Sequence, residues 1–340
     1  MRISIIGCGG IAHAHAKDLL TLRERGYDIE IPFLVDVNKE KALKLKEKLR
    51  LEEAKIVEDY KRILNKTDAV IVCTPHTLHY EHIINSLKKD VSVLVEKPMV
   101  CRLEQAYEVI EEAERRDLVL EIGFQRHFIP CFIATRDYIR EGRLGDIRVI
   151  SMILGQRWYR NFKGTWRHTL SLGGGGELID SGSHFLDVAF WTTGLKPIKV
   201  YALVNKYDTE VDINTGLVAE LSNGAILNFT VAGDDPSWYE LEIFWGDEGR
   251  LILEPPKVKM LKREGEEECT LDTSKYCSSR PVFNFVDVLL GKDVNKSPPI
   301  YGLYVIATAE AAYKSCELNR PVSIKELCKE KGLDYYKYFP

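Results

Sequence analysis

The stretch from Ile3 to Ala12 reads Ile-Ser-Ile-Ile-Gly-Cys-Gly-Gly-Ile-Ala, a short apolar run followed at once by closely spaced glycines. The apolar run is typical of a buried strand, and the spacing Gly7-x-Gly9-x-x-Ala12 is typical of the phosphate-binding turn of a dinucleotide fold. Gly7 lets the chain turn tightly, Gly9 leaves room for a pyrophosphate, and the small Ala12 lets the next helix pack closely. Because the N–H groups that open this helix attract negative charge, they are expected to face the phosphates. The residues expected to bind the cofactor here are Gly7, Cys8, Gly9, Gly10 and Ile11.

Asp36 ends the next apolar stretch, Ile29–Val35, at about the distance along the chain expected of the acidic residue that binds the ribose hydroxyls. Because a carboxylate there repels a 2′-phosphate, the sequence favours NAD over NADP, which stays the alternative cofactor. A competing interpretation is that Asp36 only caps a helix that starts near Asn38. Pro32 cannot donate to a central strand ladder, so this strand is expected to begin late.

Bulk properties exclude several classes of protein. At 340 residues the chain is long enough for two domains. The formal net charge of −4, with both signs mixed, gives no field suited to nucleic acid, so no such partner is expected. There is no signal-peptide pattern and no uncharged apolar run that could cross a bilayer, so a soluble, cytoplasmic protein with no membrane partner is expected. The eight cysteines show no C-x-x-C spacing, which predicts inert free thiols and no metal site.

Strand-like and helix-like segments alternate through residues 1–122, which predicts a Rossmann domain with a doubly wound parallel sheet. The predicted strands are Ile3–Ile6, Ile29–Val35, Ala54–Val57, Ala69–Cys73, Val91–Val95 and Leu118–Ile122. The predicted helices are Ala12–Arg25, Lys39–Leu49, Leu78–Lys88 and Leu103–Arg116. Ligands of such a sheet bind beyond the carboxyl ends of its strands. The residues at these ends that we expect to line the cofactor cleft are Thr74, Pro75, Glu96 and Lys97.

Residues 123–340 differ in pattern from residues 1–122, because alternating, turn-rich segments replace the regular alternation of strands and helices. This pattern predicts a second, α+β domain on a large, mostly antiparallel sheet, with one open face and helices on the other side. Asn223-Gly224, between two such segments, is a strong hairpin signal. Helices are predicted at 176–193, 281–290 and 301–318. The open face of this sheet is expected to lie against solvent or a partner.

Glu96-Lys97-Pro98 follows the predicted strand Val91–Val95, which places the lysine at a strand tip. Pro98 fixes the turn and biases Lys97 toward an extended backbone. An amine there, near the nicotinamide and partly desolvated, can hold a substrate hydroxyl and share its proton. The alternative is an ordinary surface lysine before a turn.

Four glycines, at positions 173–176, precede Asp180, His184 and Asp187. On a helix these three polar residues would share one face, because they are four and three residues apart. A carboxylate beside an imidazole orients the ring and raises its basicity, as a general base for an alcohol requires. His184 is therefore the predicted base. The same spacing would also suit a metal or a structural pair in the core.

The histidines at positions 76, 79 and 82 are three residues apart, but no cysteine or carboxylate completes a metal set. We interpret His79 as lining the cofactor cleft and the other two as solvated. Trp166 and Arg167, with Arg157, Tyr159 and Arg160, could supply a stacking surface and cations for a sugar or an anion, although an exposed loop would look similar.

The chain resembles the glucose-fructose oxidoreductase and inositol dehydrogenase family, called Gfo/Idh/MocA, over nearly its whole length. The resemblance rests on Gly7-x-Gly9-x-x-Ala12, Thr74-Pro75 with His79, Glu96-Lys97-Pro98, Gly123-Phe124 with Arg126 and Pro130, Trp166-Arg167, and the segment from the glycines through Asp180, Gly182 and His184 to Asp187. One departure is His127, where the family often has another basic or aromatic residue, and this is expected to alter substrate contacts.

The resemblance implies a nicotinamide-dependent enzyme that acts on a sugar, an inositol or a related polyol. It places Lys97, Asp180 and His184 at the reacting carbon and adds Arg126, Trp166 and Arg167 as substrate contacts. It also assigns substrate binding and oligomerisation to residues 123–340, with homodimers or homotetramers built through the open face of the second sheet. Two other functions stay open: an NAD-dependent glycosidase that works by transient oxidation and elimination, and a non-catalytic regulator that senses a dinucleotide.

Overall fold

The computed structural model describes residues 1–262 and 269–339, which pack as two compact units. The first unit contains Met1–Val100, Gln105–Phe124 and Ser279–Pro299. The second contains Cys101–Glu104, Gln125–Ser278 and the chain from Ile300 onward. The boundary at 122/123 remains a proposal for where the dinucleotide-binding domain ends.

The first unit is built on a six-stranded parallel sheet with the strand order β3-β2-β1-β4-β5-β6, which confirms the predicted doubly wound fold. Its strands are β1 (Ile3–Ile6), β2 (Phe33–Val35), β3 (Lys55–Val57), β4 (Ala69–Val72), β5 (Ser92–Val95) and β6 (Leu120–Ile122). Its helices are α1 (Gly10–Glu24), α2 (Lys39–Leu49), α3 (His79–Leu87), most of α4 (Leu103–Arg116), α9 (Pro281–Leu289), and the short η1 (Tyr60–Arg62), η2 (Leu64–Lys66) and η3 (His76–Leu78). Strand β2 starts directly after Pro32, as the missing N–H of proline predicts.

Helix α9 belongs to the first unit although it lies late in the chain. Its apolar residues Val282, Phe285 and Val286 are buried in the same core as strand β1 and helix α1. Tyr27 donates a hydrogen bond to Asp287 at 2.9 Å, which joins this helix to the chain just after α1. Burial of apolar surface therefore returns residues 279–299 to the Rossmann sheet.

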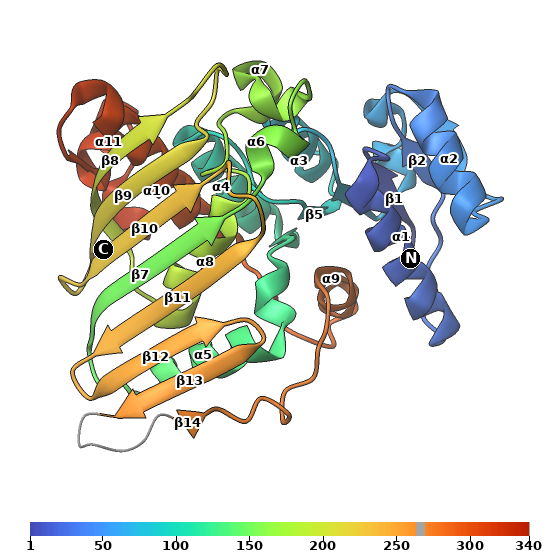
Figure 1. The fold of residues 1–340 in the computed structure, drawn as a ribbon. Coiled ribbons are helices and arrows are strands. Elements are labelled where there is room, and N and C mark those ends of the chain that lie inside the picture. Colours follow the sequence, from blue (N-terminus) through green and yellow to red (C-terminus); the bar gives the residue numbers. More distant parts are fainter. Residues whose placement is uncertain (263–268, 340) are drawn as a thin grey trace. The chain divides into compact units, whose positions relative to one another are not determined.

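The second unit is built on a nine-stranded sheet with the order β14-β13-β12-β11-β7-β10-β9-β8-β15 (Figure 1). Its strands are β7 (Ile147–Gly155), β8 (Pro197–Asn205), β9 (Asn214–Leu221), β10 (Ile226–Ala232), β11 (Tyr239–Gly246), β12 (Gly249–Glu254), β13 (Lys257–Lys262), β14 (Cys269–Thr270) and β15 (Val322–Ser323). Among the pairings of the described strands in this nine-stranded sheet, only β7–β10 is parallel, so the prediction of a mostly antiparallel sheet is confirmed. The predicted hairpin joins β9 to β10, with Gly224 at φ +84°.

Helices cover one face of this sheet and leave the other face open (Figure 1). The helices of the second unit are η4 (Gln125–Phe128), α5 (Pro130–Arg140), α6 (Trp158–Asn161), η5 (Trp166–His168), α7 (Leu170–Gly173), α8 (Gly182–Thr193), α10 (Pro299–Leu318), α11 (Ile324–Glu330) and α12 (Tyr335–Tyr338). Within residues 1–262 and 269–339, no helix has the length and apolar character needed to cross a membrane.

The helix predicted over 176–193 is shorter than expected, because α8 begins only at Gly182. The N–H of Gly182 bonds to the carbonyl of Glu177, five residues back, so this segment forms a turn rather than a regular helix. Asp180 therefore lies ahead of the helix and His184 lies in its first turn. The prediction that Asp180, His184 and Asp187 share one helical face is wrong.

Candidate active site

The glycine turn of the first unit has the geometry of a diphosphate site. Gly7 has φ +88°, and a Cβ placed there would lie 2.7 Å from the backbone of Cys73, so this position needs glycine for the fold itself. By contrast, a Cβ at Gly9 or Gly10 would meet nothing within 4 Å. Helix α1 begins at Gly10, and its N-cap Gly9 offers no side chain to the first N–H groups. Open space in front of uncapped N–H groups fits an anionic diphosphate.

Asp36 connects the tip of β2 to the glycine turn. Its Oδ2 accepts a hydrogen bond from the Cys8 N–H at 2.8 Å, and its Oδ1 accepts one from the Asn38 N–H at 2.8 Å. Asn38, not Asp36, caps helix α2 by accepting from the Glu40 N–H. Each Asp36 oxygen keeps a further lone pair. The carboxylate thus fits the predicted role of accepting ribose hydroxyls and disfavouring a 2′-phosphate.

His79 ties together the tips of β4 and β5. Its Nδ1 lies 2.7 Å from the carbonyl oxygen of Pro98, and its Nε2 lies 2.9 Å from that of Thr74. Burial lowers the pKa of His79, while these two carbonyls act in the opposite direction. The ring is completely buried and both its nitrogens are engaged. These contacts favour a role in holding Thr74 and the Lys97–Pro98 turn in place over direct contact with a cofactor.

Glu96 forms a partly buried pair with His15, whose Nε2 lies 2.6 Å from Glu96 Oε1. Burial alone would raise the pKa of Glu96, but the hydrogen bond and charge of His15, together with Lys97, hold that pKa below its usual value. A Cβ at Gly123 would lie 3.0 Å from the same carboxylate, so glycine there gives the side chain its room. The pair links helix α1 to the tip of β5, next to Lys97.

His76 and His82 are buried, so the prediction that they are solvated is wrong. His82 Nδ1 lies 3.0 Å from Thr74 Oγ1, and its ring packs edge-on against Tyr60. Burial lowers the pKa of His82 to about 4. Over residues 1–262 and 269–339, the structure contains no group of three histidine, cysteine or acidic residues that could hold a metal ion.

In the second unit, Asp180 is held by two donors from the segment that follows β7. Its Oδ2 accepts the indole N–H of Trp158 at 2.9 Å and the Nε–H of Arg167 at 2.8 Å. Arg167 lies over the rings of Trp166 and Phe162, at 4.4 Å from each centroid. Asp180 is buried, whereas Arg167 keeps 29% of its side chain exposed. The structure therefore brings together Asp180, Trp166 and Arg167 of the predicted residues.

Asp187 pairs with His127 in the core. The His127 Nε2 lies 2.9 Å from Asp187 Oδ2, and its ring stacks on Trp191 at 4.1 Å. Both side chains are fully buried. Burial raises the pKa of Asp187, and the charge and hydrogen bond of His127 oppose that rise. This pair gives His127 a structural role in place of the expected effect on substrate contacts.

Arg126 lies inside the second unit with only 4% of its side chain exposed. Its Nη2 is 2.5 Å from Glu240 Oε1 and its Nη1 is 3.2 Å from Glu242 Oε1. Its guanidinium also lies 4.3 Å from the centroid of the Phe185 ring. Burial raises the pKa of Glu242, against the pull of this arginine. These contacts favour a structural role for Arg126 over the predicted contact with substrate.

Two residues that support these groups were not found from the sequence: Trp158 and Asp212. The pairing of His15 with Glu96 was not predicted either, although His15 lies three residues after Ala12 on the buried face of a helix, where an apolar residue is expected. Trp158 and Asp212 carried no comparable signal. Both act through contacts with residues 22 to 36 positions away in the chain.

Comparison with known proteins agrees with this geometry. Residues 1–124 match the model described as "Oxidoreductase family, NAD-binding Rossmann fold", and residues 132–252 match the model of the GFO/IDH/MocA C-terminal domain. Together the two matches span more than half of the chain. The chain belongs to the Gfo/Idh/MocA family. The predicted resemblance and the NAD-binding Rossmann fold are therefore confirmed.

Relatives within the Gfo/Idh/MocA family include dehydrogenases of glucosides and of inositol. The chain is 32% identical over 202 residues to D-glucoside 3-dehydrogenase of Escherichia coli K12, a match that covers 58% of this chain and 56% of the relative. It is 31% identical over 155 residues to myo-inositol 2-dehydrogenase of Thermotoga maritima, covering 44% of each. These matches thus span about half the length of the curated relatives.

Solved structures share the fold over nearly the whole chain. An oxidoreductase domain protein from Kribbella flavida superposes with a TM-score of 0.85 at 18% identity, covering 95% of this chain and 98% of that one. A levoglucosan dehydrogenase, solved with NADH and levoglucosan, superposes with a TM-score of 0.84 at 18% identity, covering 95% and 99%. At this level of identity the likeness supports the fold.

Proposed function

We propose that this protein is an NAD-dependent dehydrogenase that transfers a hydride between nicotinamide and a hydroxyl-bearing carbon of a sugar, an inositol or a related polyol. The observation that carries this proposal is the environment of Asp180. It is a buried carboxylate that accepts hydrogen bonds from Trp158 and Arg167, and it lies directly ahead of the helix that contains His184. Bound NAD supplies the redox step by accepting or donating the hydride. NADP is the alternative cofactor, which Asp36 disfavours.

The cofactor would be held by the first unit. The turn from Gly7 to Ile11 offers backbone N–H groups to the diphosphate, and Asp36 offers carboxylate oxygens to the ribose. Thr74 and Pro75 follow the neighbouring strand β4, and His79 holds the carbonyl of Thr74. The protein thereby binds and orients the cofactor, which is its part in a redox reaction.

Each proposed catalytic residue has a separate task. Lys97 donates a hydrogen bond to the reacting substrate oxygen and stabilises its developing negative charge. His184 removes the hydroxyl proton in the oxidative direction and returns it in the reductive direction. Asp180 orients the imidazole of His184 and stabilises it when it is protonated, as a carboxylate partner does for other catalytic histidines.

Trp166 and Arg167 are the proposed substrate contacts of the second unit. The Trp166 ring offers a face to the apolar side of a sugar ring. Arg167 is fixed on two aromatic rings and by its Nε–H bond to Asp180, so the rest of its guanidinium can donate to hydroxyl or anionic groups. Because Arg126 is engaged with Glu240 and Glu242, we assign it to supporting this unit.

The test is a screen of sugars, inositols and sugar acids with NAD and with NADP, followed by absorbance of the reduced nicotinamide. Net NADH accumulation with at least one polyol supports the proposal, whereas sugar release without net NADH would instead indicate a glycosidase. Lys97→Ala and His184→Ala are expected to lose at least about a hundredfold in kcat/KM, as general acid–base groups do. Wild-type turnover in either variant would overturn these roles. Tight NAD binding without turnover of any substrate would indicate a regulator.

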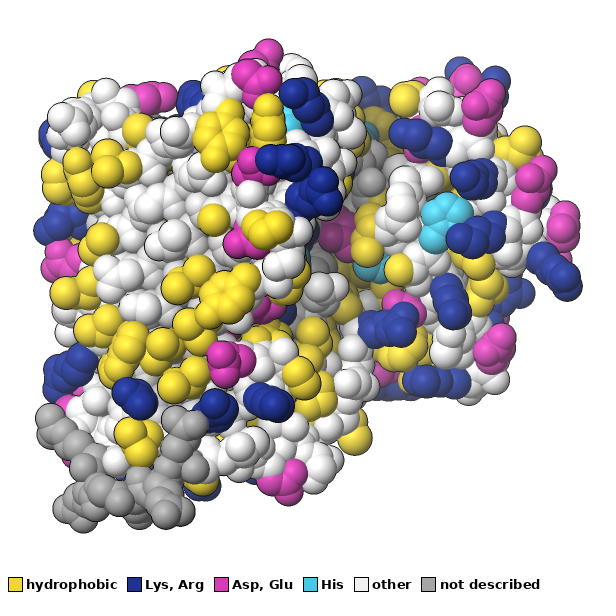
Figure 2. Space-filling model, in the orientation of Figure 1, with side chains coloured by type: hydrophobic (Ala, Val, Ile, Leu, Met, Phe, Trp, Pro, Cys, Tyr) yellow, Lys and Arg dark blue, Asp and Glu magenta, His cyan; other side chains and the backbone are white. Residues whose placement is uncertain are grey.

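We further propose that the protein works in the cytoplasm as a homodimer or homotetramer. All eight of its cysteines are free thiols, as is usual for proteins of a reducing compartment. The open face of the nine-stranded sheet carries hydrophobic side chains between charged ones (Figure 2). Its exposed apolar residues are Ile153, Leu203, Val218, Ile226 and Tyr239. A second copy of the chain would cover this apolar surface.

A further inference from the structure

The loop between β8 and β9 forms hydrogen bonds with the glycine-rich segment that leads to Asp180. The buried carboxylate of Asp212 accepts hydrogen bonds from the Gly176 N–H and the Leu178 N–H, each at 2.7 Å. The intervening Glu177 N–H bonds to the backbone carbonyl of Asp212 at 3.0 Å. Three consecutive peptide groups are thus bound by one residue, in the way that a concave run of N–H groups binds an anion.

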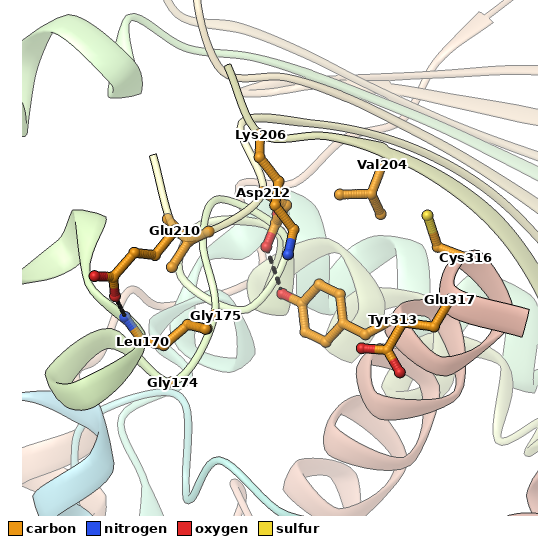
Figure 3. A pocket seen from close by; sticks show the side chains of 11 residues that line it. Leu170, Gly174, Gly175, Val204, Lys206, Glu210, Asp212, Tyr313, Cys316 and Glu317 are labelled. Carbon is orange, nitrogen blue, oxygen red and sulfur yellow. Dashed lines mark hydrogen bonds between the residues drawn. The ribbon is translucent and has the colours of Figure 1, made fainter. Parts of the chain in front are cut away.

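The contact between the two segments is close. A Cβ on Gly176 would lie 1.9 Å from the Asp212 carbonyl oxygen, so only glycine allows this approach. Tyr313 of helix α10 donates its hydroxyl hydrogen to Asp212 Oδ1 at 2.6 Å, and both residues line the same pocket (Figure 3). Burial, together with the neighbouring carboxylate, raises the pKa of Tyr313, which keeps the hydroxyl a donor. Helix α10 therefore orients the carboxylate of Asp212 through Tyr313.

Two routes lead from this loop to Asp180. Along the backbone, the Gly176 carbonyl accepts the Asp180 N–H at 2.9 Å. Through side chains, Val211 and Ile213, on either side of Asp212, form a buried cluster with Trp158, whose indole donates to Asp180. The main chain and the carboxylate of Asp180 are thus both supported by the stretch from Val211 to Ile213.

We propose that Asp212 is a positioning residue for the reaction: it fixes the turn of Gly176–Leu178 and thereby the places of Asp180 and of His184 in the first turn of α8. This inference rests on the proposed function, because it explains the contact by its effect on catalysis. A carboxylate is needed because it only accepts hydrogen bonds. An asparagine would turn its amide NH₂ toward one of the two N–H groups and lose that bond.

The test is Asp212→Asn, compared with Asp247→Asn as a matched control. Asp247 also accepts a backbone hydrogen bond, from the Asp146 N–H at 2.9 Å, but it lies beyond the far end of β11. Amide hydrogen exchange is measured over peptides that contain residues 174–182. In Asp212→Asn, amide exchange in these peptides is expected to be at least about tenfold faster, while exchange elsewhere in the second unit changes little. In the control Asp247→Asn, exchange over residues 174–182 is expected to stay unchanged. Unchanged exchange would overturn the proposal, whether or not a substrate is known.

Kinetics separate positioning from plain structural support. With a polyol or sugar that the wild-type enzyme oxidises, Asp212→Asn is expected to lower kcat about 10- to 100-fold while the Kd for NADH stays within about twofold. Tyr313→Phe keeps both hydrogen bonds from backbone N–H groups to Asp212. Its kcat is therefore expected to lie between the values of Asp212→Asn and of the wild type. Wild-type kcat in Asp212→Asn, with accelerated exchange, would show that the contact serves stability alone. Absence of any wild-type turnover would instead count against the proposed function.

Discussion

At the scale of single residues, the most informative bond is the one from Trp158 to Asp180. Hydrogen bonds to charged groups contribute about 1.5–3 kcal/mol. Trp158→Phe keeps an aromatic ring in the buried cluster and removes only the donor, so kcat is expected to fall about 10- to 100-fold. Steady-state kinetics with a substrate that the wild-type enzyme oxidises measure this loss.

Trp238→Phe is the matched control for this prediction, since its indole donates to Glu240 at 3.0 Å from an exposed position. It is expected to leave kcat unchanged. A wild-type kcat in Trp158→Phe would show that Arg167 alone is enough to hold Asp180.

Glu121 is one buried residue that gives the fold a pH dependence. It is completely buried in β6, and neither carboxylate oxygen has a hydrogen-bond partner. Burial, with a smaller contribution from Asp293 and against Lys296, raises the pKa of Glu121 well above its usual value. A folded-state pKa above the unfolded one gives stability that is fully present below the unfolded pKa and is lost as the pH rises toward the folded pKa.

Glu121→Gln removes this loss because it keeps the neutral shape of the protonated side chain. At pH 8 the variant is expected to be more stable than the wild type by about 1–3 kcal/mol, and at pH 4 the two are expected to be nearly equal. Thermal unfolding of both proteins across this range measures the difference. A stability difference that stays constant with pH would contradict the prediction.

At the scale of elements, the start of α1 separates glycines needed for folding from glycines needed for binding. Gly7→Ala forces a side chain onto a φ of +88° and against the backbone of Cys73, so a loss of about 1–3 kcal/mol of stability is expected. Gly9→Val places its side chain in open space, so the fold is expected to be unaffected. The Kd for NADH is expected to rise about tenfold or more, because the valine fills the space proposed for the diphosphate.

Thermal unfolding and a fluorescence titration with NADH measure the two effects independently. Loss of stability in Gly9→Val with unchanged NADH affinity would reverse the assignment. Gly26→Val is a suitable control, since this glycine follows α1 at its other end and a Cβ there also meets nothing within 4 Å. Its φ of +89° predicts some loss of stability but an unchanged Kd.

Elements of the Rossmann sheet could be predicted from the sequence because their signals are local. The apolar run before Gly7, and Pro32 ahead of β2, report directly on the backbone around them. The start of α8 could not be predicted, because the peptide groups of Gly176–Leu178 are held by Asp212, more than thirty residues away. The same holds for Asp187, whose partner His127 is 60 residues away. Contacts between residues so far apart in the chain leave no periodic pattern in the sequence.

At the scale of the whole molecule, the path of the chain between its units was the hardest feature to foresee. Helix α9 is amphipathic, and its sequence does not say which of two sheets it will cover. The structure packs it in the first unit, through Val282, Phe285 and Val286. In the candidate site, the residues in motifs were found, whereas the residues that support them from other elements, such as Trp158, were not.

The open face of the nine-stranded sheet leads to the last prediction, which concerns assembly. Ile153 on β7 and Val218 on β9 are exposed there, with 38% and 46% of their surfaces accessible. A glutamate at either position would become a buried unpaired charge if a second copy covers the face, and such a charge opposes association strongly. Ile153→Glu and Val218→Glu are therefore expected to weaken the oligomer at least about tenfold in light scattering coupled to gel filtration. Leu290→Glu, equally exposed but at the end of α9, is expected to leave the mass unchanged. A wild-type protein that is monomeric at high concentration, or sheet variants that keep the wild-type mass, would show that this apolar face serves something other than self-association.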